Sequence, residues 1–448
     1  MAFFKYSTLI NINNIYLRLL FYLFVWNLYL FFMSINSPLG TDWLPWHSQR
    51  IFNFSEYLNI NGFFYNYGFS IWEQDINLSF QPENFKNSIY LGANLFSQLP
   101  YVLLNKFFGE NFLREYGHLI DKTIILSTGI LIIELFIKLN PKKIFSNNYQ
   151  LQILLIFILF VVNPWTYKMI LASWTQIFFI FFFLLGLLMF LSKKNNVGLS
   201  FFFIAGLIDY QISAGLFVYY SFFLIYYKIN KNIKSYRNFF PNISRKKNIE
   251  FQIIISFVLP IFIFYFLRFL VSDDFNTDAS LLLSRIGISG NDIHNGGIVG
   301  SLQFLGGNRI TQCLIDLNSD LNSIPLDSKI YIFNCALSIM GMFLISIISL
   351  WGLITISAKE SKLFNLILCP LIFLLASFTF LLQQSSSAHL MGYSYFFSII
   401  FAFGLSSFIF NILKKYKFSP IAVILTLPVI AGVVILCIRV SMLTGING

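Results

Sequence analysis

Apolar runs of 18 or more residues recur along the whole chain, and they constrain the fold more than any other feature of the sequence. Each is long enough to cross the hydrocarbon core of a bilayer, about 30 Å thick, as a helix. Of the 448 residues, 57% are hydrophobic and 11% are charged, whereas soluble domains are about 25% charged. This composition excludes a soluble enzyme, a disordered chain and a secreted disulfide scaffold.

We predict an all-α polytopic membrane protein with about eleven transmembrane helices, in which residues 1–448 form a single integral-membrane domain. The N-terminal apolar run is longer than the hydrophobic region of a signal peptide, so we expect it to remain as the first span. Asn163-Pro164 interrupts the third span. The predicted spans are 15–35, 118–138, 151–171, 174–192, 198–209, 212–228, 251–272, 330–356, 363–382, 390–412 and 419–440.

Charged residues are distributed unequally between the two sides of the predicted bundle. Most of the 30 basic residues fall in alternate short loops, whereas most of the 19 acidic residues fall on the opposite side. The positive-inside rule makes the basic side cytoplasmic. We therefore expect a bacterial inner-membrane protein with a cytoplasmic N-terminus and a periplasmic C-terminus. The net charge of +11 then reflects topology, and no nucleic-acid partner is expected.

Two predicted loops are long, and both lie on the outer, periplasmic side. They cover residues 36–117 and 273–329. The cytoplasmic loops are short, so we expect a functional site at the outer mouth of the bundle. No ATP is available there, and the chain has no G-x-x-x-x-G-K-[ST] motif, which argues against a nucleotide-driven pump. The four cysteines form no CxxC or Cys/His cluster, so neither a disulfide framework nor a zinc site is expected.

The first outer loop begins with an aspartate that is followed closely by aromatic and basic residues. Asp42 follows the first span closely and precedes two tryptophans, His47 and Arg50. A carboxylate at that depth could accept a proton from a hydroxyl while Arg50 binds a phosphate. The alternative is a solvated loop aspartate beside an aromatic belt at the bilayer interface.

Two further parts of this loop carry predictions. Glu73 and Asp75 are two residues apart, so they share a face only on a strand. They form either a second acidic or metal-binding site or part of an exposed loop. Residues 88–108 are apolar but broken by Asn94, Gln98 and Pro100, which indicates an interfacial helix on the outer membrane surface.

Four polar residues near other outer segments are additional candidates. Arg268 lies near the outer end of the seventh span, where it either pairs with the nearby aspartates or meets a lipid phosphate. Arg309 follows a short apolar segment bracketed by Gly-Gly pairs. This segment either dips onto the membrane or forms two tight turns. His389 and Asp209 mark outer turns, and a short polar turn explains each of them most simply.

The order of these features resembles the GT-C superfamily of integral-membrane glycosyltransferases. The shared features are one span, a long outer loop with an early acid, an interfacial helix, and a Pro-containing apolar stretch that ends at Gly109 before the second span. The likeness covers residues 15–140 in detail and the rest in outline. It implies a polyprenyl-phosphate-sugar donor, with Asp42 as the catalytic base.

The resemblance implies an enzyme that transfers a sugar to a glycan, lipid or protein acceptor at the outer face of the inner membrane. Many members have two adjacent acids in the first loop, whereas Asp42 is followed by Trp43. The second acid, which in that family often binds a metal ion, could then be Glu56, Glu73 or Asp75. Whether a divalent cation serves as cofactor is left open by the sequence. We expect His47, Arg50, Glu73, Asp75, Arg268, Arg309 and His389 to bind substrate.

Two other functions remain open from the sequence. An O-antigen or polysaccharide polymerase also has about eleven spans and large outer loops, but it needs paired arginine-rich outer segments, and the outer arginines here are scattered. A lipid-linked glycan flippase or other transporter usually carries internal repeats and polar residues at the midplane. No repeat is evident, and few ionisable residues lie near the midplane of a predicted span.

Overall fold

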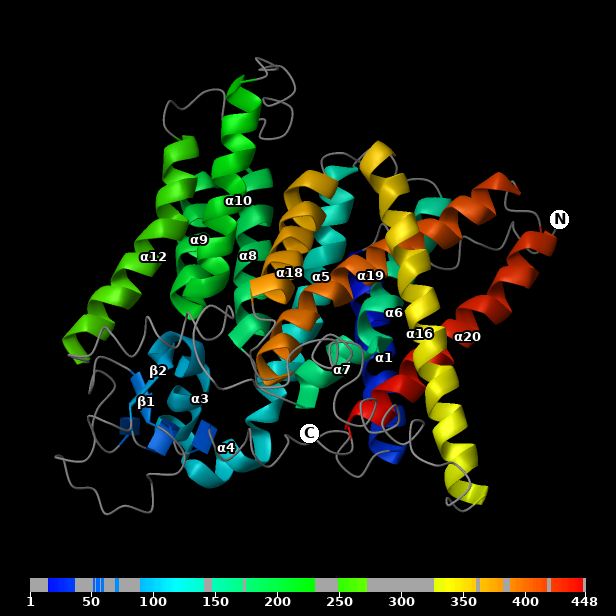
Figure 1. Cartoon of the computed structure of the whole chain (residues 1–448), viewed down its shortest axis with the longest axis horizontal. Coiled ribbons are helices and arrows are strands. Elements are labelled where there is room, and N and C mark those ends of the chain that lie inside the picture. Colours follow the sequence, from blue (N-terminus) through cyan, green and yellow to red (C-terminus); the bar gives the residue numbers. More distant parts are fainter. Residues whose placement is uncertain are drawn as a thin grey trace.

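The computed structural model is nearly all helical (Figure 1). It describes residues 15–36, 69–71, 89–140, 147–171, 175–229, 249–271, 326–359, 363–381, 387–416 and 420–445, and helical residues 51–52, 54–56 and 58–59. The helices are α1 (Ile15–Asn36), α3 (Leu95–Phe108), α4 (Glu110–Tyr116), α5 (His118–Leu139), α6 (Asn147–Val162), α7 (Pro164–Leu171), α8 (Thr175–Leu191), α9 (Asn195–Ile208), α10 (Tyr210–Ile229), α12 (Ile249–Val271), α16 (Leu326–Lys359), the π-helix η7 (Phe364–Leu368), α18 (Cys369–Leu381), α19 (Ser387–Lys415) and α20 (Pro420–Gly445).

Helices occupy all eleven ranges that the sequence predicts as spans. Within the described residues, four helices are long and apolar enough to cross a membrane, namely those that contain Tyr16–Ser34, Phe251–Leu270, Ala336–Ile356 and Tyr395–Lys415. Five apolar helices of 10–17 residues accompany them. These features fit an all-α membrane protein, while the number of eleven spans and the orientation of the termini stay predictions.

Burial differs sharply among the four long apolar helices. The apolar window of α19 is 78% buried, whereas those of α1 and α12 are 28% buried. α1, α12 and α16 expose large apolar side chains such as Phe24, Phe262 and Trp351. An apolar surface of this extent is unfavourable in water. The pattern places α19 inside the bundle and gives α1, α12 and α16 faces suited to lipid.

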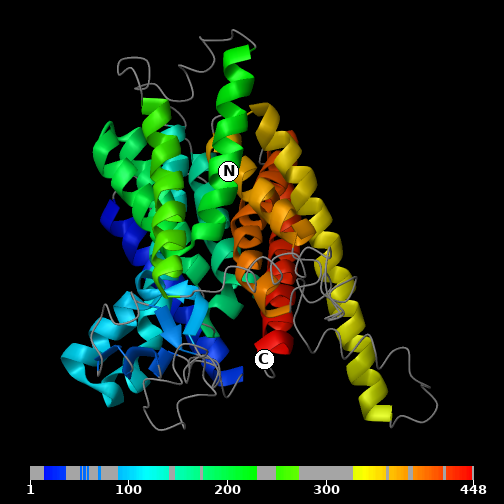
Figure 2. The same cartoon turned by 60° about the vertical axis from the view of Figure 1, so that its left-hand side comes forward.

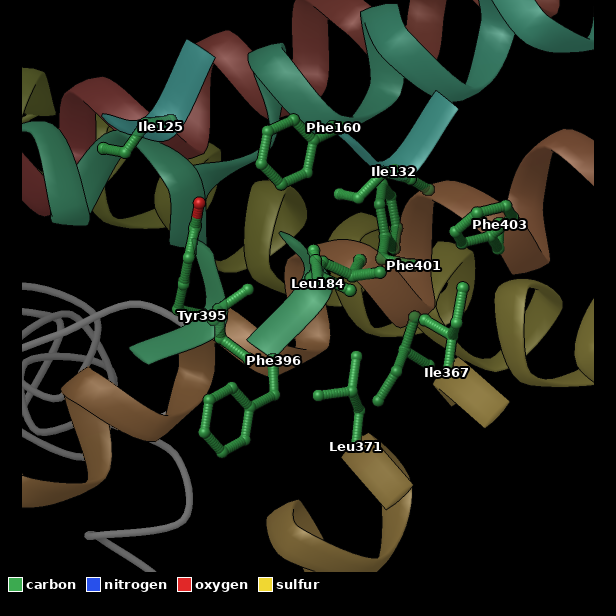
Figure 3. Close-up of a cluster of buried hydrophobic side chains, with 14 of the residues drawn as sticks. Ile125, Ile132, Phe160, Leu184, Ile367, Leu371, Tyr395, Phe396, Phe401 and Phe403 are labelled. Atoms are coloured by element: carbon green, nitrogen blue, oxygen red, sulfur yellow. The ribbon is translucent and has the colours of Figure 1, made fainter. Parts of the chain in front are cut away.

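The core around α19 is built from apolar side chains of several helices. Figure 3 shows Tyr395, Phe396, Phe401 and Phe403 of α19 among residues from α5, α6, α8, η7 and α18. The indole ring of Trp165 packs edge-on against Phe397, with ring centroids 4.6 Å apart. Such edge-to-face aromatic pairs are favourable beyond the area that they bury.

The break at Asn163-Pro164 is confirmed, because α6 ends at Val162 and α7 begins at Pro164. The side-chain oxygen of Asn163 accepts the backbone N–H of Thr166 at 2.8 Å, as an N-cap residue does. Its amide nitrogen donates to the carbonyl oxygens of Leu159 and Phe160. Pro164 stands at the first helical position, which a proline favours. The break is therefore fully hydrogen-bonded, although Asn163 is completely buried.

The elements from the first predicted loop gather at one end of the bundle (Figures 1 and 2). They are β1 (Phe69–Ile71), β2 (Ile89–Asn94), α3 and α4. We call this the outer end, following the predicted topology, and the opposite end the inner end. α3 contacts α8 and α9, and α4 leads directly into α5. The outer end therefore combines loop elements with the ends of bundle helices.

The predicted interfacial helix over 88–108 is wrong in its first part. Residues Ile89–Asn94 form strand β2, which pairs antiparallel with β1, and the helix begins only at Leu95. Strand formation suits Ile89-Tyr90, because β-branched and aromatic residues favour strands and Gly92 disfavours a helix. Among the described residues, this two-stranded sheet is the part that departs from the predicted all-α fold.

Candidate functional site

The structure describes two of the eight residues predicted for the site. Arg268 lies in the last turn of α12, and His389 lies in the first turn of α19, where its backbone is described. The other six lie outside the described residues; they are Asp42, His47, Arg50, Glu73, Asp75 and Arg309. The predicted catalytic base and its neighbours therefore stay predictions.

Arg268 lies beside an aromatic contact between α10 and α12. Tyr210, the first residue of α10, stacks on Phe264 with ring centroids 3.7 Å apart, and it meets Tyr265 edge-on. Arg268 is half-buried and close enough to Tyr210 to interact with it electrostatically. This contact fixes the end of α12, so the guanidinium is held near the outer end of the bundle.

The simple interpretation of Asp209 as a polar turn is confirmed. Its side chain is buried between α9 and α10 and caps the start of α10. One carboxylate oxygen accepts the backbone N–H groups of Gln211 and Ile212, both at 3.1 Å. The other accepts the Thr175 hydroxyl at 3.3 Å and the Gln176 amide at 3.1 Å. Four donors satisfy this carboxylate, which indicates a structural role.

A second buried acid lies in the first turn of α5 and has a different environment. Asp121 is 0% exposed and its neighbour Lys122 is 5% exposed. The hydroxyl of Tyr101, which comes from α3, donates a hydrogen bond to the Asp121 carboxylate. Buried ionisable residues in membrane proteins are costly and often mark functional sites. We therefore regard Tyr101, Asp121 and Lys122 as the centre of the candidate site.

Polar side chains extend from this centre through the first-loop elements. Asn105 of α3 donates from its amide to the Ser55 hydroxyl at 3.0 Å, and Ser55 donates to the Phe52 carbonyl oxygen. Gln98 is 7% exposed, and its side-chain oxygen has no hydrogen-bond partner among the described residues. Gln98, Tyr101 and Asn105 share one face of α3 by their spacing. A polar seam thus runs along α3 towards α5.

The Tyr101 side chain also links this seam to the bundle. Its ring packs edge-on against Phe178 of α8, with centroids 5.9 Å apart and planes 87° apart. α3 is therefore held against α8 by an aromatic contact and linked to α5 by a hydrogen bond. The arrangement places a carboxylate and an ammonium group in a protected position at the outer end. Such groups can bind hydroxyl and phosphate groups of a substrate.

Sequence reasoning missed this cluster. In the sequence, Asp121 is one of many acidic residues on the predicted outer side, and no motif singles out Lys122. The available signal was an acidic and a basic residue side by side in the first turn of an otherwise apolar helix. Within the described residues, no three His, Cys, Asp or Glu side chains form a group that could hold a metal ion. The divalent cation that the sequence leaves open would therefore have to be held by residues of the first loop outside the described part of the chain.

We expect Tyr101→Phe to destabilise the junction between α3 and α5 by about 1–3 kcal/mol, because it leaves the buried Asp121 carboxylate without its hydroxyl donor. The ring contact with Phe178 is kept in this variant. The free energy of unfolding in mixed micelles measures the effect. Tyr226→Phe is the matched control, since Tyr226 is exposed near the end of α10. Equal stability of the two variants would contradict a significant Tyr101–Asp121 hydrogen bond.

Comparisons with protein-family models, with curated proteins and with solved structures found no match to this chain.

Proposed function

We propose that this protein is a membrane glycosyltransferase that transfers a sugar from a polyprenyl-phosphate donor to a glycan, lipid or protein acceptor. The observation that best supports this proposal is the buried Tyr101–Asp121–Lys122 cluster at the outer end. It lies where the first-loop elements meet the bundle. A transferase that takes its donor from the membrane needs its polar site at such a boundary.

The position of the cluster favours a transferase over a transporter. Transport sites lie near the bilayer midplane, commonly in broken helices. Asp121 and Lys122 lie in the first turn of α5. The helix break at Asn163 is capped by its own side chain and neighbouring backbone groups, so it offers few free polar groups to a substrate.

In the proposed reaction the acceptor hydroxyl attacks the anomeric carbon in line, and the configuration at that carbon inverts. Asp42 takes the hydroxyl proton as general base. The bond from the anomeric carbon to the phosphate oxygen breaks, and the lipid phosphate leaves. Basic side chains stabilise the charge of that leaving group; we assign this role to Lys122 together with Arg50, Arg268 and Arg309. The hydrogen bond from Tyr101 to Asp121 holds α3 against α5, in which Lys122 is the next residue.

The test is the sugar composition of surface glycans and glycolipids in a deletion strain of the source bacterium. The strain is complemented with the wild type, Asp42→Asn or Lys122→Gln. We expect one sugar to disappear on deletion, to return with the wild type, and to stay absent with Asp42→Asn. Lys122→Gln should reduce its amount strongly. Membrane levels of each variant are measured by immunoblotting.

Lys194→Gln is the matched control for the lysine variant, because Lys194 is exposed in the turn between α8 and α9. It should restore the sugar fully. Full restoration by Asp42→Asn would overturn the assigned base. An unchanged composition with shortened polymer chains would favour a polymerase instead, and accumulation of lipid-linked glycan on the cytoplasmic side would favour a flippase.

A further inference from the structure

An exposed stack of aromatic rings lies where α3 ends and α4 begins. The rings of Phe108 and Phe112 stack with centroids 4.8 Å apart, and those of Phe112 and Tyr116 are 4.7 Å apart. Phe107 is 72% exposed and Phe108 is 63% exposed. We call Phe107, Phe108, Phe112 and Tyr116 the aromatic ridge. The rings of Phe108, Phe112 and Tyr116 contact one another in series near the surface, whereas the bundle's core aromatics pack inside it.

The fold uses another side of α4 for packing. Leu113 is fully buried, and the Arg114 guanidinium lies over the ring of Phe52, 4.2 Å from its centroid. Arg114 also pairs with Glu110 one turn earlier. α4 is thus attached to the first-loop elements through Leu113 and Arg114. The ridge takes no part in this attachment, so its exposure needs a separate explanation.

Gly109 fixes the direction in which the ridge runs. Its backbone has φ 86° and ψ 166°, a conformation that residues other than glycine rarely adopt. α3 ends at Phe108 and α4 begins at Glu110, so this glycine forms the corner between them. α4 crosses the outer end of the bundle beneath α3 and α5 (Figure 1). The corner keeps Phe108 stacked on Phe112 although the helix is interrupted.

The ridge is continuous with the surface of α5, which follows α4 after Gly117. Leu119, in the first turn of α5, is 46% exposed. Aromatic residues at the end of an apolar helix are typical of the membrane–water interface. Lys106, next to Phe107, is exposed, and a positive charge near a membrane surface attracts lipid phosphate groups. Arg114 does not add to this charge, because Glu110 neutralises it.

We propose that the aromatic ridge docks into the headgroup layer of the outer leaflet of the membrane that holds the bundle. The partner is the lipid surface. Docking would hold α3, and with it Gln98 and Tyr101, at a fixed height relative to α5. The inference depends on residence in a membrane and is independent of the proposed transfer reaction. It also shifts the predicted interfacial element from residues 88–108 to the corner between α3 and α4.

The test uses site-directed spin labels on the full chain. In a background where the four native cysteines are alanine, Phe112→Cys is labelled and the protein is reconstituted into phosphatidylcholine–phosphatidylglycerol vesicles. Collision rates with oxygen, which enriches in lipid, and with a water-soluble nickel chelate are measured. Asn111→Cys is the matched control, because Asn111 is exposed on the same helix about 100° away from Phe112. Oriented insertion is checked by protease protection of a C-terminal tag.

We expect the label at position 112 to collide several-fold more with oxygen and several-fold less with the nickel chelate than the label at 111. Equal, water-like accessibility at both positions would overturn the proposal. A label at 112 that is shielded from both reagents would also overturn it, because the ridge would then be covered by protein. If Phe112→Cys folds poorly, the same two collision rates are measured with a label at Phe108→Cys, at one end of the stack.

Discussion

Gly404→Ala should force α16 and α19 apart and strongly destabilise the bundle. A Cβ atom on Gly404 would overlap the Ser349 carbonyl oxygen and lie 2.6 Å from the Ser349 hydroxyl oxygen. The same atom on Gly352 would overlap the Gly404 carbonyl oxygen. The obstructing atoms are mostly backbone, so a side-chain rotation cannot relieve the overlap.

The two helices approach this closely because small residues line the crossing, as is common between membrane helices. Ser349 also donates its hydroxyl to the Phe401 carbonyl oxygen at 3.2 Å, and Asn411 donates to Thr355 at 2.9 Å. The added methyl group would push these hydrogen bonds apart. We expect a loss of at least about 3 kcal/mol, at the upper end of the usual cost of overpacking.

The thermal unfolding midpoint in detergent, followed by size-exclusion chromatography, measures this effect. Gly432→Ala is the matched control, since nothing lies within 4 Å of a Cβ atom added to that glycine of α20. It should leave the midpoint unchanged or raise it slightly, because alanine favours helices over glycine. If Gly404→Ala unfolds at the same temperature as Gly432→Ala, α16 and α19 do not cross as closely as the structure shows.

The helices were the most predictable part of the fold. Apolar runs of sufficient length indicate helices whatever their neighbours are, so each predicted range contains one. The break at Asn163-Pro164 was also visible, because proline removes a hydrogen-bond donor locally. Strand β2 was not, since its pairing with β1 joins residues about twenty positions apart. The residues next to a strand in the sequence do not show which distant segment it pairs with.

Polar pairing in the bundle was less predictable than helix position. Glu134 and Lys138 lie four residues apart on α5, a spacing that allows an ion pair within one helix. The structure instead pairs Glu134 with Arg18 of α1. Local spacing shows which residues on one helix can meet, but the choice of a partner on another helix depends on how the helices pack. For the same reason, the cluster of Tyr101, Asp121 and Lys122 became apparent only once α3 was placed beside α5.

Loss of the Arg18–Glu134 pair should weaken the attachment of α1 to the bundle. The two side chains are joined by a hydrogen bond of 2.9 Å, with 9% exposure of the Arg18 side chain and 29% of that of Glu134. Tyr22, one turn after Arg18, is fully buried, and its ring contacts that of Phe157 of α6 with centroids 4.4 Å apart. Glu134→Leu would leave the Arg18 charge largely buried without this carboxylate.

We expect Glu134→Leu to cost about 2 kcal/mol, less than the usual loss for a fully buried pair because Glu134 is partly exposed. The double variant Arg18→Met/Glu134→Leu should recover most of that loss, since it removes both charges together. Reversible unfolding in mixed micelles gives the four free energies of this double-mutant cycle. If the two single losses simply add in the double variant, the charges act independently and the ion pair does not hold α1. If the cycle shows strong coupling, this pair at the inner end fixes the helix from which the first outer loop, with Asp42, extends.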